Sequence, residues 1–171
     1  PQRQWYCILR CGRVGRRHFM TSFAQTDQQK MAVALKPVLA ETVQLYVLTQ
    51  NVHWNVTGPL FQAVHTLTET QYTELAAAID EIAERIRTLG EKAPGRMSAY
   101  MELGTISEGD ENAQAEDMVR ALVDANQIVA DRIRPLIGKA ADAGDEVTAG
   151  LLTDRLTVHE KACWMLRAML G

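Results

Sequence analysis

The sequence is poor in cysteine and proline, and it contains no long uninterrupted apolar run. Three cysteines in 171 residues are an odd number, which argues against a disulfide framework and indicates a reducing compartment. No apolar run approaches the ~20 residues of a membrane-spanning helix, so we do not expect a membrane protein. Only five prolines are present, and long stretches without a helix breaker favour an all-α fold. The length suits one domain with a buried core.

The net charge of −3 is unevenly distributed. Residues 1–19 contain five arginines and no acidic residue, so the remaining 152 residues carry a net charge of −8. An acidic body with a basic arm is typical of a protein that contacts DNA through its tail. The alternative is that Met20 is the natural start and that residues 1–19 derive from upstream sequence. The candidate DNA-binding residues of the arm are Arg3, Arg10, Arg13, Arg16 and Arg17.

After this arm, assigned to residues 1–26, helical periodicity extends over a predicted bundle domain at 27–171. Long helices are expected at about 27–56, 59–89, 112–139 and 145–170, with a short helix near 98–103. Gly58-Pro59 and Gly90 mark helix ends, and Pro135 is expected to interrupt the third long helix. Four antiparallel helices with one long crossover are the arrangement of ferritin-like folds. We therefore predict an all-α, ferritin-like four-helix bundle with the short helix in the crossover between the second and third long helices.

One face of the expected helix 59–89 carries His65, Glu69, Asp80 and Glu84. At about 100° per residue these four positions share one arc, which lies apart from the apolar face of the helix. At ~1.5 Å per residue, Asp80 lies about 22 Å from His65, too far for one ion to contact both. A twofold axis would bring the acidic pair of a second, antiparallel copy opposite the histidine. Two identical sites at the interface would result.

His53, just before the Gly-Pro turn, is expected to reach the same place. Two imidazoles and three carboxylates form a mixed nitrogen and oxygen ligand set that suits Fe(II) and, less specifically, Zn(II) or Mn(II). The alternative needs no metal: His65 and Glu69 would form a simple i,i+4 pair, and Arg87 would relieve the repulsion between the two acids near the helix end.

Three segments resemble the Dps family, the DNA-binding proteins from starved cells: HWNVTGPLFQAVHTLTE…AIDEIAERIRTLG, GDEVTAGLLTDRL and HEKACWMLRAML. The resemblance covers essentially residues 27–170. It implies a hollow shell of twelve copies built from twofold dimers, in the bacterial cytoplasm and associated with the nucleoid. The ligands of the family's site for two irons match His53, His65, Glu69, Asp80 and Glu84. The family usually has aspartate where Glu69 stands, and the longer glutamate is expected to shift the second iron or alter its affinity.

By the same resemblance, the protein is expected to oxidise Fe(II) with hydrogen peroxide and to store ferric mineral inside the shell. Trp54 matches a tryptophan that the family keeps beside the iron and that is thought to quench radicals; the simpler alternative for Trp54 is core packing. Asp145 and Glu146 are the candidates for an acidic iron-entry pore, although Gly150 stands where relatives are often acidic. Acidic residues at a helix N-terminus are the alternative explanation.

Two other function classes are alternatives. The first is a non-enzymatic shell that condenses DNA through its basic arms and holds only structural metal. The second is a di-iron enzyme with its metals in the bundle core, which needs Glu-x-x-His motifs on two helices. The sequence contains no such motif, so this second class is disfavoured.

Overall fold

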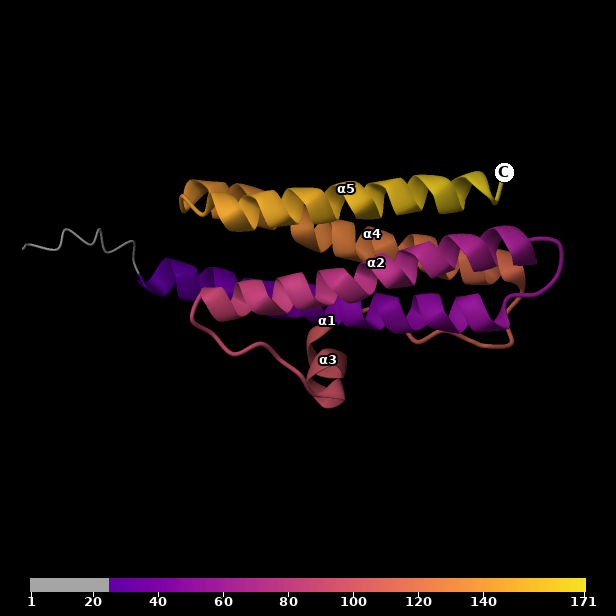
Figure 1. Cartoon of the computed structure of the whole chain (residues 1–171), viewed down its shortest axis with the longest axis horizontal. Helices are drawn as coiled ribbons and strands as arrows, with labels where there is room; N and C mark the ends of the chain where they lie inside the picture. Colours follow the sequence, from indigo (N-terminus) through magenta and orange to yellow (C-terminus); the bar gives the residue numbers. More distant parts are fainter. Residues whose placement is uncertain (1–24) are drawn as a thin grey trace, which may run out of the picture.

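The computed structural model describes residues 25–171, which form five helices and no strand. The helices are α1 (Gln25–Asn55), α2 (Phe61–Thr88), α3 (Met97–Leu103), α4 (Ala115–Asp142) and α5 (Glu146–Ala168). Helices α1 and α2 run antiparallel, and so do α4 and α5 (Figure 1). Helices α2 and α4 run parallel, because the long connection that contains α3 returns the chain along the bundle between them. The predicted all-α bundle with a short helix in its long crossover is confirmed.

Glycines mark the helix ends much as the sequence predicted. Gly58 between α1 and α2 and Gly90 after α2 have φ angles of 82° and 92°, a conformation that residues with a Cβ rarely adopt. The expected interruption at Pro135 is wrong, because α4 continues through it to Asp142. Both Pro135 and Asp131, whose carbonyl loses its helical partner, are exposed. Water can therefore satisfy that carbonyl without breaking the helix.

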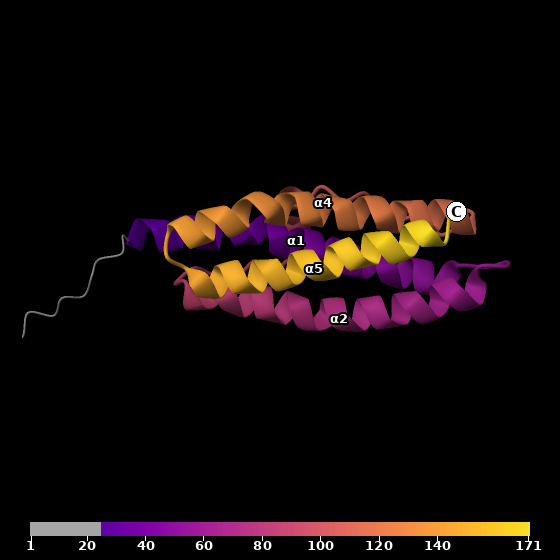
Figure 2. The same ribbon diagram turned by 90° about the horizontal axis from the view of Figure 1, so that it is seen from above.

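The bundle consists of two helical hairpins, α1–α2 and α4–α5, which pack against each other with the core between them (Figures 1 and 2). The long side chains that fill this core are each at most 1% exposed: Leu35, Leu45, Ile82, Leu122, Ile133, Leu152 and Leu166. Full burial of such a side chain contributes about 1.5–3 kcal/mol relative to exposure. Hydrophobic packing between the hairpins therefore dominates the stability of the bundle.

Among the described residues, α1 alone is long and apolar enough to cross a membrane, by length and composition. In this structure α1 is a core helix, packed against α2, α3 and α4. It also carries a fully buried carboxylate. Glu41 accepts hydrogen bonds from Nε and Nη2 of Arg132 on α4 at 2.5 and 2.6 Å, and Thr105 donates a third at 2.9 Å.

The crossover lies against α1, on the side of the α1–α2 hairpin away from α4 and α5 (Figure 1). Two glycines allow this close approach. A Cβ on Gly104 would lie 2.1 Å from the side-chain oxygen of Gln44, and one on Gly109 would lie 2.6 Å from Leu48. One face of the hairpin therefore carries α3, while its opposite face packs on the rest of the bundle.

Candidate metal centre

Two histidines from different helices lie face to face beside the turn between α1 and α2. His53 is in the last turn of α1 and His65 in the second turn of α2, each six residues from Pro59. Because the helices reverse direction at this turn, these equivalent positions lie opposite each other. Their rings stack with centroids 3.8 Å apart and planes inclined by 16°. The ring of Phe61 also stacks with that of His65, with centroids 5.0 Å apart.

The two histidines hold each other through reciprocal backbone hydrogen bonds. Nδ1 of His53 lies 2.9 Å from the carbonyl oxygen of His65, and Nδ1 of His65 lies 2.8 Å from the carbonyl oxygen of His53. A carbonyl can only accept, so each Nδ1 carries the proton. This leaves Nε2 as the nitrogen that would bind a metal, the usual arrangement of a histidine ligand whose other nitrogen is held by a carbonyl.

Thr68 supports this arrangement from within α2. Its side chain is fully buried, and its hydroxyl donates to the carbonyl of Val64 at 2.7 Å. The same oxygen lies 3.3 Å from Nδ1 of His53. His53 is therefore held in place by α2 as well as by its own helix.

The three carboxylates are exposed side chains of α2: Glu69, Asp80 and Glu84. The residues that α2 buries are Val64, Thr68, Leu75, Ala78, Ile82 and Ile86. Viewed down the helix axis, the mean direction of these buried side chains is on the order of 140° from the middle of the arc that holds His65, Glu69, Asp80 and Glu84. The helix thus directs this arc away from the core of its own bundle.

The chain by itself assembles only part of the predicted ligand set. His53 and His65 meet, and Glu69 follows His65 by one turn of α2. Asp80 and Glu84 lie toward the other end of this continuous helix. Within residues 25–171, no group of three or more His, Cys, Asp or Glu side chains comes together in a metal-binding arrangement. Within the described residues, the histidine pair is therefore not joined by further metal ligands.

The surroundings of His53 differ from what the sequence suggested. Trp54 is 68% exposed, so core packing within the chain is wrong as an explanation for it. Among the described residues, the rings in contact with His53 are those of His65 and Tyr72. Tyr72 was not predicted to lie near the site, although its position seven residues after His65 places it on the same face of α2.

The carboxylate of Asp145 is already engaged within the chain. It caps α5 by accepting from the backbone N–H of Thr148 at 3.0 Å, and Nη2 of Arg85 donates to it at 2.6 Å. Asp145 therefore acts as the N-terminal cap of α5, which is the alternative to the pore that the sequence left open. Glu146 is exposed in the first turn of α5. The pore role of Asp145 and Glu146 stays a prediction, and the five arginines of the arm lie outside the described residues.

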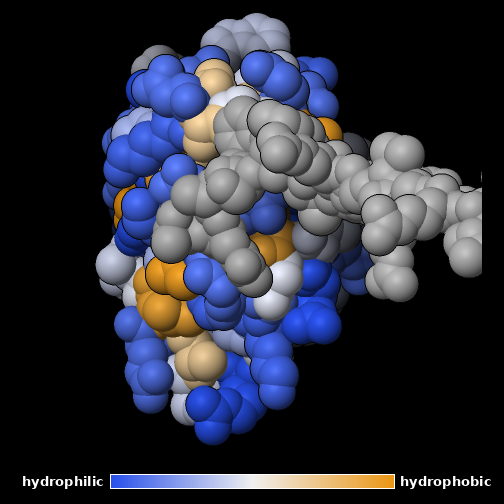
Figure 3. All heavy atoms as spheres, turned by 90° about the vertical axis from the view of Figure 1, so that its left-hand side faces the viewer, coloured by the Kyte–Doolittle hydropathy of each residue, from blue (hydrophilic) through white to orange (hydrophobic). Residues whose placement is uncertain are grey.

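The end of the bundle where α1 begins and α4 meets α5 is largely hydrophilic in the view of Figure 3, with small hydrophobic patches.

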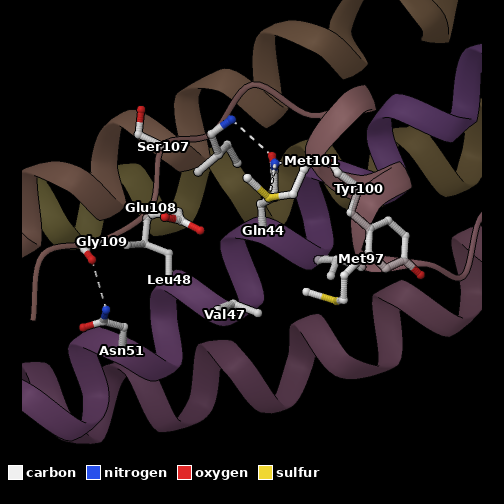
Figure 4. Close-up of a pocket in the computed structure, with 12 residues that line it drawn as sticks. Gln44, Val47, Leu48, Asn51, Met97, Tyr100, Met101, Ser107, Glu108 and Gly109 are labelled. Carbon is white, nitrogen blue, oxygen red and sulfur yellow. Dashed lines mark hydrogen bonds between the residues drawn. The ribbon is translucent and has the colours of Figure 1, made fainter.

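A more apolar surface follows the side of α1 that carries α3. There a pocket of about 240 Å³ opens between α1 and the crossover (Figure 4). Val47, Met97 and Met101 line this pocket and are 49%, 63% and 53% exposed. We call Val47, Met97 and Met101 the α1/α3 apolar face.

The Ferritin-like domain family matches residues 32–171 of the chain. A DNA protection during starvation protein from Bacillus anthracis is 38% identical over 145 residues, which cover 85% of this chain and 99% of that protein. The structure is similar to the crystal structure of a Dps protein from Vibrio cholerae, described as a ferritin-like diiron-carboxylate protein. The TM-score is 0.82 and the identity 35%, with 86% of this chain and 92% of the other covered.

A Dps protein from Bacillus brevis is similar to the same degree, with a TM-score of 0.81, 35% identity, and coverage of 85% of this chain and 98% of the other. Family, relatives and fold agree over the whole bundle. The chain therefore belongs to the Dps family of ferritin-like proteins.

Proposed function

We propose that this protein oxidises Fe(II) at sites shared between two antiparallel copies and stores the ferric product inside a shell of twelve subunits. The observation that carries the proposal is the stacked histidine pair. Each Nδ1 is held by a backbone carbonyl, which leaves Nε2 of each ring as the nitrogen that would bind a metal, yet residues 25–171 bring no third ligand to the pair. Kinship with ferritin-like diiron-carboxylate proteins supports iron as the metal.

The donor set fits iron as the substrate of such a site. Neutral imidazoles and carboxylates bind Fe(II), and the same set admits Zn(II) or Mn(II) less specifically. His53 and His65 would supply nitrogen ligands, and Asp80 and Glu84 of the partner subunit would supply oxygen ligands. Glu69 lies one turn from His65 and would contribute the remaining carboxylate. The negative charge of these groups favours the ferric product.

We further propose hydrogen peroxide as the preferred oxidant. Two Fe(II) ions supply the two electrons that cleave the O–O bond, so that 2 Fe²⁺, H₂O₂ and 2 H⁺ give 2 Fe³⁺ and 2 H₂O. Hydroxyl radical is then not released. The protein supplies the ligands and the spacing of the two ions, while the electron transfer is the chemistry of the metal.

The α1/α3 apolar face supports association on this side of the molecule. Apolar area removed from water contributes about 25 cal/mol per Å². A second copy that covered the partly exposed side chains of Val47, Met97 and Met101 would be held in this way. Val47 lies on α1, the helix that also carries His53, and the two methionines lie on α3, which packs against α1 (Figure 1).

Fe(II) oxidation by substituted chains tests the proposal. We expect His65→Ala and Asp80→Ala each to lose rapid oxidation, measured as the rise of ferric absorbance after addition of peroxide or air-saturated buffer. Glu81→Ala is the matched control, because Glu81 is exposed next to Asp80 but lies outside the arc. Wild-type rates in the Asp80→Ala variant would contradict the shared site, and faster oxidation by dioxygen than by peroxide would contradict the proposed oxidant.

DNA binding through the arm is a second activity to test. The observation that favours it is the run of five arginines without an acidic residue in residues 1–19. Many copies of such an arm on one shell would multiply weak phosphate contacts. DNA retardation across a salt series, with the full chain and with a chain lacking residues 1–19, measures this contribution. Equal retardation by both chains would exclude the arm.

A further inference from the structure

We propose that a groove between α2 and α5 binds a small aromatic acid that also carries a hydroxyl or N–H group. The residues that line this α2/α5 groove include Leu67, Gln71 and Leu75 of α2 and His159, Lys161 and Met165 of α5. Neither histidine of the stacked pair and none of the candidate carboxylate ligands is among the lining residues. The groove is therefore a binding site separate from the proposed iron chemistry.

Helices α2 and α5 pack loosely against each other. Each packs closely on its hairpin partner, whereas α2 and α5 contact each other only sparsely. Figure 2 shows the two ribbons separating toward the C-terminal end of α5. Several side chains on the facing sides are small: Ala63, Thr66, Thr70 and Ala162. A cavity of about 560 Å³ remains between the helices, and this volume is within the range of sites for small organic ligands.

The walls of the groove are apolar and suit an aromatic ring. Leu67 and Leu75 of α2 lie along one side, and Met165 and Met169 of α5 along the other. A methionine thioether adapts its shape to its neighbours and makes favourable contacts with aromatic rings. A ring between these walls would remove apolar area from water, which supplies the main driving force for binding.

The buried side of the groove holds polar groups, and one of them lacks a partner. Asn126 and His159 are 4% and 1% exposed, and Nδ1 of His159 donates to Oδ1 of Asn126 at 2.9 Å. Oε1 of Gln71 is also buried, but no donor within residues 25–171 reaches it. A buried acceptor without a donor is uncommon in folded proteins. Gln71 is half-buried and lines the groove, so its side chain can turn this oxygen toward a ligand hydroxyl or N–H group.

The charges around the groove favour an acid over a base as the ligand. The carboxylate of Glu74 is already paired with Arg155, whose Nη2 donates to it at 3.1 Å. Burial lowers the pKa of His159 to about 3, so this ring is neutral at neutral pH. Lys161 is exposed at the rim, and within the described part of the chain it forms no salt bridge. Its ammonium group is therefore available to a ligand carboxylate.

Three matched naphthalene probes test these assignments. 6-Hydroxy-2-naphthoate carries both the hydroxyl and the carboxylate, 6-methoxy-2-naphthoate lacks the donor, and 2-naphthol lacks the carboxylate. Binding is measured by calorimetric titration of the full chain in its native assembly, freed of iron with a chelator. We expect hydroxynaphthoate to saturate at one molecule per chain, and methoxynaphthoate to bind roughly 3- to 10-fold more weakly.

Single substitutions assign each contact. Lys161→Ala should weaken hydroxynaphthoate binding roughly 2- to 5-fold and leave naphthol binding unchanged. Lys139→Ala, at an exposed position of α4 outside the groove, should change neither. Gln71→Leu should remove the preference for hydroxynaphthoate over methoxynaphthoate. Thr70→Trp should fill the groove and abolish binding, whereas Thr73→Trp, exposed on α2 but outside the lining, should bind as wild type does.

Circular dichroism verifies that each variant folds, and Ala63→Trp is a second blocking variant from the same exposed side of α2. Absence of saturable hydroxynaphthoate binding by wild type, or unchanged binding by the folded blocking variants, would refute the site. Equal affinity for all three probes, unaltered by Lys161→Ala, would refute the proposed ligand class. Because the titrations contain no iron, their outcome is independent of the ferroxidase proposal.

Discussion

A mixture of two inactive variants should regain activity that neither has alone. His65 and Asp80 are fifteen residues apart on one continuous helix of 28 residues. Their Cα atoms are therefore about 22 Å apart along the axis, and one ion cannot touch both. In the proposed arrangement, His65→Ala chains lack the imidazole half of the site, and Asp80→Ala chains lack the carboxylate half. Each variant retains the half that the other has lost.

The size of the recovery follows from twofold symmetry. Random association of equal amounts gives mixed dimers in about half of the cases, and each mixed dimer has two sites. One of these sites combines an intact histidine half with an intact carboxylate half, while the other lacks both. About one quarter of all sites should therefore regain rapid Fe(II) oxidation.

The two variants are unfolded together, refolded, and compared with each variant refolded alone. Oxidation is measured per mole of chain, and native mass spectrometry verifies that mixed dimers form. A mixture of His53→Ala with His65→Ala is the matched control. Both substitutions affect the same half of the site, so no mixed dimer contains an intact site. Recovery in this control, or none in the first mixture despite mixed dimers, would refute the shared site.

Three further predictions concern stability. Arg132→Leu leaves the buried carboxylate of Glu41 without its cation, and urea titration should show a loss of about 3–5 kcal/mol; Arg134→Leu, in an exposed ion pair, should lose about 0–1 kcal/mol. Burial lowers the pKa of His159 to about 3. Between pH 6.5 and pH 3, His159 is therefore protonated in the unfolded chain but not in the folded chain. The free energy of unfolding should fall over this range by up to about 1.4 kcal/mol per pH unit. This slope should be shallower in His159→Gln. Asp145→Ala should lose about 1–2 kcal/mol on urea unfolding, whereas Asp145→Asn, which keeps the α5 cap, should lose less.

The sequence predicted the helices well because hydrophobic periodicity and glycine punctuation are local properties. Gly58 and Gly90 stand at the helix ends, as expected. The prediction at Pro135 failed because the cost of a proline depends on whether the carbonyl one turn earlier can reach water. That carbonyl belongs to Asp131, whose exposure depends on how α4 packs against its neighbours.

The separation of His65 from Asp80 followed from the sequence alone, because rise and rotation per residue are constant along a helix. This was sufficient to predict that a metal site needs two chains. Whether the histidines carry free Nε2 atoms, by contrast, depends on carbonyls from the neighbouring helix. Contacts across helices depend on interhelical distance and side-chain rotamers, which the sequence pattern does not encode.

The same distinction applies to Tyr72, Trp54 and Asp145. Their positions on the helices could be read from the sequence, but packing decided that Tyr72 contacts His53, that Trp54 is exposed and that Asp145 pairs with Arg85. Local geometry along each helix therefore determined the faces and spacings of the candidate ligands. Only the packing of α1 against α2, and of α2 against α5, decided which groups meet, because those contacts join residues far apart in the chain.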